Sequence, residues 1–79
     1  MNNKEKYQSI FIESLSINKD SFSEDTKYNE IPEWDSIGHM TLMSGLEEGF
    51  QISLETDDIV DFSSFKKGIE ILKKYKVNI

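Results

Sequence analysis

One serine and the chain's single histidine, three residues apart, are the side chains in this sequence best placed to do chemistry. Ser36 follows Asp35 and stands where an extended segment gives way to the spacing of an amphipathic helix. A phosphate ester on that hydroxyl would lie against the free backbone N–H groups and the positive dipole end of the helix. Asp35 could hold a cation or cap the helix. The pattern therefore predicts an attachment point for a phosphate-linked group.

Two simpler interpretations compete with that one. Ser36 could be only a helix cap, which is the commonest role of a serine at such a boundary. His39 lies about one turn later, so a serine–histidine nucleophile pair is also conceivable. The chain has no second histidine, and a protein of 79 residues offers no obvious oxyanion-hole turn or deep pocket. We therefore expect His39 to be a packed or half-exposed helix residue and the protein to lack catalytic activity of its own.

The helices that must position Ser36 follow from apolar spacing. A first helix is predicted from Asn3 to Leu15 and a second from Ser36 to Phe50, with Asp35 or Ser36 as its N-cap. The long connection between them, residues 16–34, is rich in turn formers, and Pro32 should keep the chain extended before the second helix. The first helix has apolar residues at Tyr7, Ile10, Phe11 and Leu15; the second has Met40, Met43, Leu46 and Phe50, with Leu42 beside them; the connection has the anchors Phe22, Tyr28, Ile31 and Trp34.

Two further helices complete the prediction. A short one is expected from Asp57 to Asp61, with Thr56 as its cap. Ser63 or Ser64 should cap the last helix, one side of which is lined by Phe65, Ile69 and Leu72. The fold predicted for residues 1–79 is a single all-α domain. It is a small four-helix bundle with three main helices, a short third helix and a long loop between the first two.

Composition restricts the function classes. Without cysteine the chain has no disulfide and no thiolate metal site, which fits a reducing compartment, and we expect no resident metal. No stretch resembles a signal peptide or a membrane span, so we expect a cytoplasmic protein. Residues 28–65 contain nine acidic residues and no lysine or arginine. Such a charge disfavours nucleic acid and membrane surfaces and attracts basic protein surfaces.

The stretch from Trp34 to Phe65 resembles the acyl carrier proteins, the phosphopantetheine-binding four-helix domains. In that family an aspartate, the modified serine and an apolar residue open the second helix, which ends in an acidic Leu-Glu-Glu-x-Phe sequence. An Ile-x-Leu segment and a short acidic third helix follow. The matching residues here are Asp35-Ser36-Ile37, Leu46-Glu47-Glu48-Gly49-Phe50, Ile52-Ser53-Leu54 and Asp57-Asp58-Ile59.

The resemblance implies specific roles. Ser36 would receive 4′-phosphopantetheine from coenzyme A through a separate phosphopantetheinyl transferase (holo-ACP synthase), and the arm's thiol would hold acyl groups as thioesters. Asp35 would help to bind magnesium during that transfer. Ile37 would pack against partner enzymes beside the arm. The partners would be acyl-loading and acyl-transferring enzymes with basic surfaces. The expected docking residues are Ile37, Met40, Glu47, Glu48, Asp57, Asp58 and Asp61.

The chain departs from carriers of general fatty acid synthesis, which have more acidic residues early in the second helix. Gly38, His39 and Thr41 stand there instead. The sequence from Trp34 to Met40 resembles stand-alone carriers that serve dedicated pathways. An aminoacyl or peptidyl carrier, using the same arm, is one alternative. A second is an unmodified helical adaptor that binds basic proteins through its acidic face. We expect a monomer, since a carrier must visit several partners.

Overall fold

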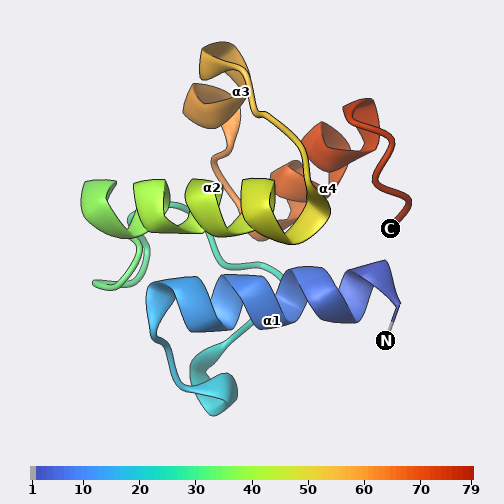
Figure 1. Ribbon diagram of the computed structural model, residues 1–79. Coiled ribbons are helices and arrows are strands. Elements are labelled where there is room, and N and C mark those ends of the chain that lie inside the picture. The colour runs from blue at the N-terminus through green and yellow to red at the C-terminus, as the bar shows by residue number, and fades with distance from the viewer. Residues whose placement is uncertain (1) are drawn as a thin grey trace.

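The computed structural model describes residues 2–79, which form the helices α1 (Asn3–Leu15), η1 (Lys19–Ser21), α2 (Ser36–Phe50), α3 (Thr56–Asp61) and α4 (Phe65–Lys74). Figure 1 shows α1 and α2 side by side and antiparallel, with α3 across α2 from α1 and α4 near the far end of α2. Among these residues there is no β-strand. The predicted small all-α bundle is therefore confirmed, and the bounds predicted for the first two helices agree with the structure. The short η1 within the long loop was not predicted.

Every helix except α3 begins directly after a residue whose side chain caps it; Asn2 caps α1 and Asn18 caps η1. Asp35 caps α2, because its carboxylate accepts a hydrogen bond from the backbone N–H of Gly38. Ser64, and not Ser63, caps α4. The prediction that Thr56 caps the third helix is wrong, because Thr56 is already the first residue of α3 and the preceding residue makes no capping bond.

Glycines allow α1 and α2 to pack closely. Gly45 and Gly49 stand four residues apart on α2, so they share one face of that helix. A Cβ atom on Gly49 would lie 2.5 Å from Cδ1 of Ile10, and one on Gly45 would lie 2.6 Å from Oγ of Ser14. Both separations are too short for a carbon atom. A larger residue at either position would therefore require the side chain of Ile10 or Ser14 to shift.

The stripe predicted for α2 is partly wrong. Leu42, Met43 and Leu46 are buried, whereas Met40 is 56% exposed. At 3.6 residues per turn, Met40 lies about 110° around the helix from the centre of those three side chains. The face that carries Met40 therefore points to solvent. Met40 was assigned to the stripe because it lies three residues before Met43, but that spacing leaves it outside the buried face.

The long loop is folded back onto the helices by its aromatic residues. Trp34 is fully buried, and Phe22 and Ile31 are partly buried against the core. Trp34 packs edge-on against the Phe11 ring, with centroids 5.0 Å apart. Tyr28 is the exception, since it remains 39% exposed. The predicted anchoring of the loop is therefore confirmed for Trp34, Phe22 and Ile31.

Backbone hydrogen bonds fix the rest of the loop. The N–H of Tyr28 donates to the carbonyl of Ser63 at 2.8 Å, and the N–H of Phe65 donates to the carbonyl of Thr26 at 3.0 Å. These bonds join the loop to the connection between α3 and α4. The segment before α2 is a turn and is not extended as predicted, because the N–H of Trp34 bonds to the carbonyl of Ile31. Proline is favoured at the second position of such a turn, which Pro32 occupies.

The chain ends lie near each other (Figure 1). The side-chain amide of Asn3 donates to the carbonyl of Asn78 at 3.1 Å. Within the described part of the chain, each helix is too short or too polar to cross a lipid bilayer.

We expect Tyr7→Phe to lower the free energy of unfolding by about 1–3 kcal/mol, the usual cost of leaving a buried polar group without its partner. The buried Tyr7 hydroxyl donates to the carbonyl of Phe65 at 2.8 Å, and burial raises the pKa of Tyr7 far above its ordinary value. Urea denaturation measures the change. The control is Tyr28→Phe, at a partly exposed site, which should change stability by less than about 0.5 kcal/mol. Equal losses in the two variants would contradict the role given to Tyr7.

Candidate functional site

Ser36 is the first residue of α2, and its side chain is exposed. Its Oγ atom lies 3.2 Å from the hydroxyl of Tyr28, within hydrogen-bonding distance. Because Asp35 takes the capping position, the Ser36 hydroxyl is not used to cap the helix. The interpretation of Ser36 as a mere cap is therefore wrong. Its hydroxyl faces solvent, where a modifying enzyme can reach it.

The backbone around Ser36 provides hydrogen-bond donors for an anion. The first helical backbone bond of α2 runs from the N–H of His39 to the carbonyl of Asp35, at 2.7 Å. The N–H groups of Ser36 and Ile37 precede that bond, so the helix itself supplies no acceptor for them. The capping bond to Gly38 uses Oδ1 of Asp35. The other carboxylate oxygen of this exposed side chain remains a possible cation ligand.

Gly38 allows the loop to approach the first turn of α2. A Cβ atom on this residue would overlap the carbonyl oxygen of Glu33 and would lie 3.1 Å from Cδ2 of Leu15. The lack of a side chain at Gly38 therefore lets the loop lie directly against the start of the helix.

His39 links three segments around the site. Its Nδ1 accepts a hydrogen bond from the indole N–H of Trp34 at 2.9 Å, and its Nε2 lies 2.8 Å from the carbonyl oxygen of Ile59. Indole nitrogen only donates and a carbonyl only accepts, so these partners select the neutral imidazole with its proton on Nε2. We call this pair of bonds the His39 bridge. The prediction of a packed, half-exposed histidine is confirmed, and both ring nitrogens have partners other than Ser36.

Exposed apolar side chains lie on α2 and α3. Ile37 is 79% exposed and Met40 is 56% exposed, as a docking role requires. Val60 on α3 is 76% exposed and was not predicted. Its short helix turns Ile59 inward and leaves Val60 outside. A helix of six residues has too few apolar positions for their spacing to predict which of Ile59 and Val60 is buried.

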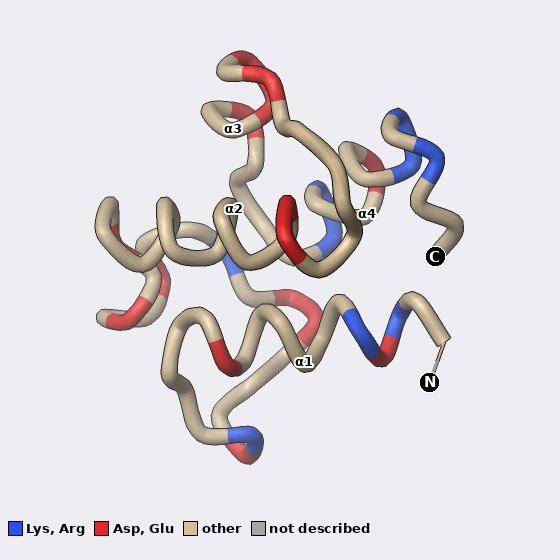
Figure 2. The backbone as a smooth tube through the Cα atoms, viewed as in Figure 1, with Lys and Arg blue, Asp and Glu red and all other residues tan. Residues whose placement is uncertain are grey.

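Acidic residues dominate α3, the far part of α2 and the loop that leads into α2, while most of the lysines lie on α4 and the first turns of α1 (Figure 2). Of the predicted docking acids, Glu48, Asp57 and Asp61 are exposed. Glu47 is half-buried, and its Oε2 accepts from the N–H of Leu54 at 2.8 Å, so it also holds the turn after α2. Exposed acids near this surface that were not predicted as docking residues include Glu30, Glu33 and Glu55.

The prediction that Asp58 belongs to the docking face is wrong. Asp58 is 7% exposed, and its carboxylate accepts hydrogen bonds from the ammonium group of Lys74 and the hydroxyl of Tyr75. The same hydroxyl accepts from the N–H of Glu55 at 2.9 Å. Asp58 therefore fastens α3 to the end of α4. Successive residues of a helix point in different directions. Asp58 therefore faces the bundle, whereas its neighbour Asp57 faces solvent.

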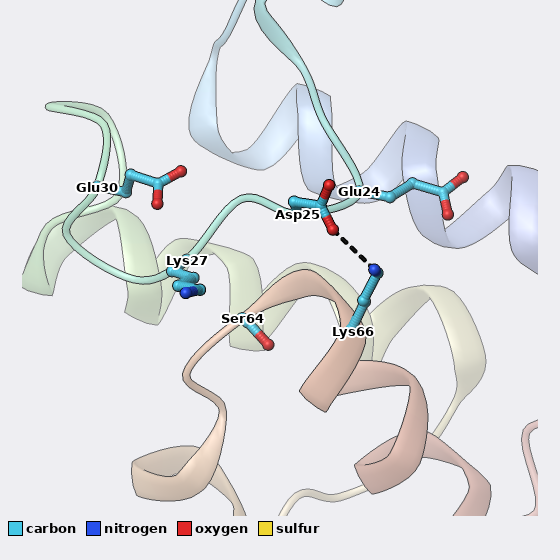
Figure 3. Close-up of a pocket in the computed structure, with 6 residues that line it drawn as sticks. All are labelled: Glu24, Asp25, Lys27, Glu30, Ser64 and Lys66. Carbon is cyan, nitrogen blue, oxygen red and sulfur yellow. Dashed lines mark ion pairs between the residues drawn. The ribbon is translucent and has the colours of Figure 1, made fainter.

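Two hollows adjoin the loop. One, of about 250 Å³, is a groove lined by Tyr28, His39, Ile59, Val60, Phe62 and Ser63. The other, drawn in Figure 3, lies between the loop and the start of α4 and contains the Asp25–Lys66 ion pair at 2.7 Å. Lys66 lowers the pKa of Asp25. Lys27 lines the second hollow and its neighbour Tyr28 lines the groove, as expected for successive side chains of a segment in a β-bridge.

The comparisons with known proteins give no family. No protein-family model, curated protein or solved structure matches the chain. The functional interpretation therefore depends on the residues and the geometry described above.

We expect Asp58→Asn to destabilise the fold at neutral pH and to make little difference in strong acid. Lys74 first, and then Tyr75, lower the pKa of Asp58 below its ordinary value near 3.8. A carboxyl whose folded pKa is lowered stabilises the fold above its unfolded pKa, and this stabilisation is lost as pH falls through the folded pKa. Urea denaturation of both proteins at pH 7 and in strong acid measures the difference.

Asp57→Asn is the matched control for this prediction, because Asp57 is the exposed neighbour of Asp58 on the same helix. Its substitution should leave stability nearly unchanged at both pH values. A penalty for Asp58→Asn that persisted undiminished in acid would show that the ionised carboxylate is not what fastens α3.

Proposed function

We propose that this protein is an acyl carrier of the phosphopantetheine-binding kind, with the arm attached to Ser36 through a phosphodiester. The observation that carries the proposal is the exposed Ser36 hydroxyl at the start of α2, with Asp35 as the cap. The Asp-Ser-Ile sequence and the Leu-Glu-Glu-Gly-Phe sequence at the end of the same helix agree with it.

The surroundings of Ser36 fit a phosphate group. The helix N-terminus offers the N–H groups of Ser36 and Ile37, and the dipole of α2 favours negative charge there. Tyr28 adds a hydroxyl 3.2 Å from the attachment oxygen, and this hydroxyl can donate to a phosphate oxygen. When bound, the arm supplies a thiol, which the cysteine-free chain lacks. The protein's own residues hold the arm's phosphate and present the arm to solvent.

The partner surface in this proposal has an apolar centre and an acidic rim. Ile37, Met40 and Val60 are exposed. The rim consists of Glu48, Asp57 and Asp61, to which the loop adds Glu30 and Glu33. Opposite charge speeds encounter and favours partners with basic surfaces, while a buried apolar contact supplies affinity. A phosphopantetheinyl transferase and acyl-transferring enzymes of the cytoplasm are the proposed partners.

Presentation of one tethered thioester to several enzymes is the proposed mechanism. A tether raises the effective concentration of the cargo at each docked enzyme without any new contact. The carrier itself then lowers no chemical barrier. The absence of a catalytic role is consistent with the contacts of His39, because its two ring nitrogens are bonded to Trp34 and Ile59.

Intact-mass measurement tests the proposal. The purified protein is incubated with coenzyme A, magnesium and a broad-range phosphopantetheinyl transferase. We expect one phosphopantetheine per chain in the wild-type protein and none in Ser36→Ala. Ser44→Ala, on an exposed position of the same helix, is the matched control and should be modified like the wild type. Failure of the wild type to gain mass would favour an unmodified adaptor.

Asp35→Asn separates the two roles of Asp35. Asparagine is as good an N-cap as aspartate, so the bond to the N–H of Gly38 and the helix should persist. It lacks the negative charge that a magnesium ligand needs. We expect unchanged stability and a modification rate reduced roughly tenfold or more, the scale of effect when a group that supports a metal site is lost. An unchanged rate would mean that Asp35 serves only as a cap.

A further inference from the structure

The groove lined by Tyr28, His39 and Val60 lies next to Ser36, with the side chain of Tyr28 between them. Tyr28 both lines the groove and places its hydroxyl 3.2 Å from Oγ of Ser36. The groove is open to solvent at the exposed side chain of Val60. The residues that line it include the apolar Ile59, Val60 and Phe62 and the hydroxyl-bearing Tyr28 and Ser63. A ligand in this groove would therefore meet both apolar carbon and hydrogen-bonding groups.

Aromatic rings close the floor of the groove. Phe62, which lines it, is 1% exposed, and Trp34 behind it is fully buried. The centroids of the His39 and Phe62 rings are 6.1 Å apart, and those of Trp34 and Phe62 are 6.4 Å apart. Tightly packed interiors have few voids, so an alkyl chain could pass this floor only by displacing rings. The groove can accommodate a short group but gives no passage to the core.

The His39 bridge closes the route between α2 and α3. Its bonds join Trp34 of the loop to His39 of α2, and His39 to the backbone of Ile59 in α3. Separating α3 from α2 to admit a long chain would break the bond from Nε2–H of His39 to the Ile59 carbonyl, and would leave that N–H and that carbonyl without partners. Each such loss in a partly buried place is unfavourable. The bridge therefore keeps α3 against α2.

We propose that this groove binds a short acyl group with a hydroxyl or amino substituent, carried on the Ser36 arm, and that the His39 bridge excludes longer alkyl chains from the core. The inference rests on the proposed function, because it assigns the cargo of that same arm. Tyr28 and Ser63 can donate to or accept from the substituent, while Ile59 and Val60 contact the carbon chain. The part of a long alkyl tail that extends beyond the groove would find no route into the core and would remain in water.

Amide NMR of the loaded protein tests the inference. The transferase is given the coenzyme A thioesters of 3-hydroxybutyrate, butyrate and octanoate, and intact mass confirms loading. We expect 3-hydroxybutyryl to shift the amide signals of Val60, Phe62 and Ser63, and to shift them more than butyryl does. Octanoyl should leave the amides of Met43 and Leu46 and the indole N–H of Trp34 where they are in the unacylated arm-bearing protein.

Two results would overturn the inference. One is movement of the Met43, Leu46 or Trp34 signals by octanoyl, which would show a chain in the core. The other is a groove that responds no more to 3-hydroxybutyryl than to butyryl. Failure to load any thioester is a different result, visible by mass alone, and would count against the proposed function.

Substitutions at the bridge give a second readout. His39→Leu removes both hydrogen bonds, and octanoyl should then shift Met43 and Leu46. His39→Gln keeps a donor and an acceptor and should behave more like the wild type. His39→Phe, which keeps an aromatic ring stacked on Trp34 and removes both hydrogen bonds, replaces His39→Leu should that variant fail to fold. Identical responses to octanoyl in a folded bridge-deficient variant and the wild type would overturn the role of the bridge.

Discussion

The burial of Trp34 beneath the start of α2 is the contact on which the rest of the site depends. The loop between α1 and α2 has little regular structure, and ordering its backbone costs conformational entropy. A fully buried indole, packed on Phe11 and bonded to His39, offsets part of that cost. Because Trp34 stands two residues before Ser36, its burial holds the end of the loop against the bundle next to the start of α2.

Gly38 and His39, in the first turn of α2, both serve to join the loop to that helix. Gly38 accepts the carbonyl of Glu33 against the first turn of α2, where any larger residue would collide. His39 follows and reaches from α2 to both Trp34 and Ile59. The pair therefore joins loop, α2 and α3 with short contacts. It leaves the neighbouring Ile37 and Met40 exposed to solvent.

Apolar spacing and capping residues predicted the bounds of the main helices well. They did not predict the roles of residues whose partners lie far away in the sequence. The bounds of α1 and α2 follow from apolar spacing and from an aspartate suited to capping. The exposure of Ser36 follows from Asp35 taking the cap. The fate of Asp58 could not be predicted, because it depends on Lys74 and Tyr75, sixteen and seventeen residues away. The His39 bridge could not be predicted either, because the partner of His39 in α3 is a backbone carbonyl, which every residue type has.

The central claim is that Ser36 carries a phosphopantetheine arm in the cell. Residues 28–66 contain one lysine, at the end, and no arginine, so cleavage after lysine releases Ser36 within a single peptide that begins at Tyr28. Tandem mass spectrometry of that peptide, from protein purified from its own cells, tests the claim most directly. We expect a peptide that loses a pantetheine fragment and maps the attachment to Ser36. A peptide recovered wholly unmodified, or modified at another serine, would contradict it.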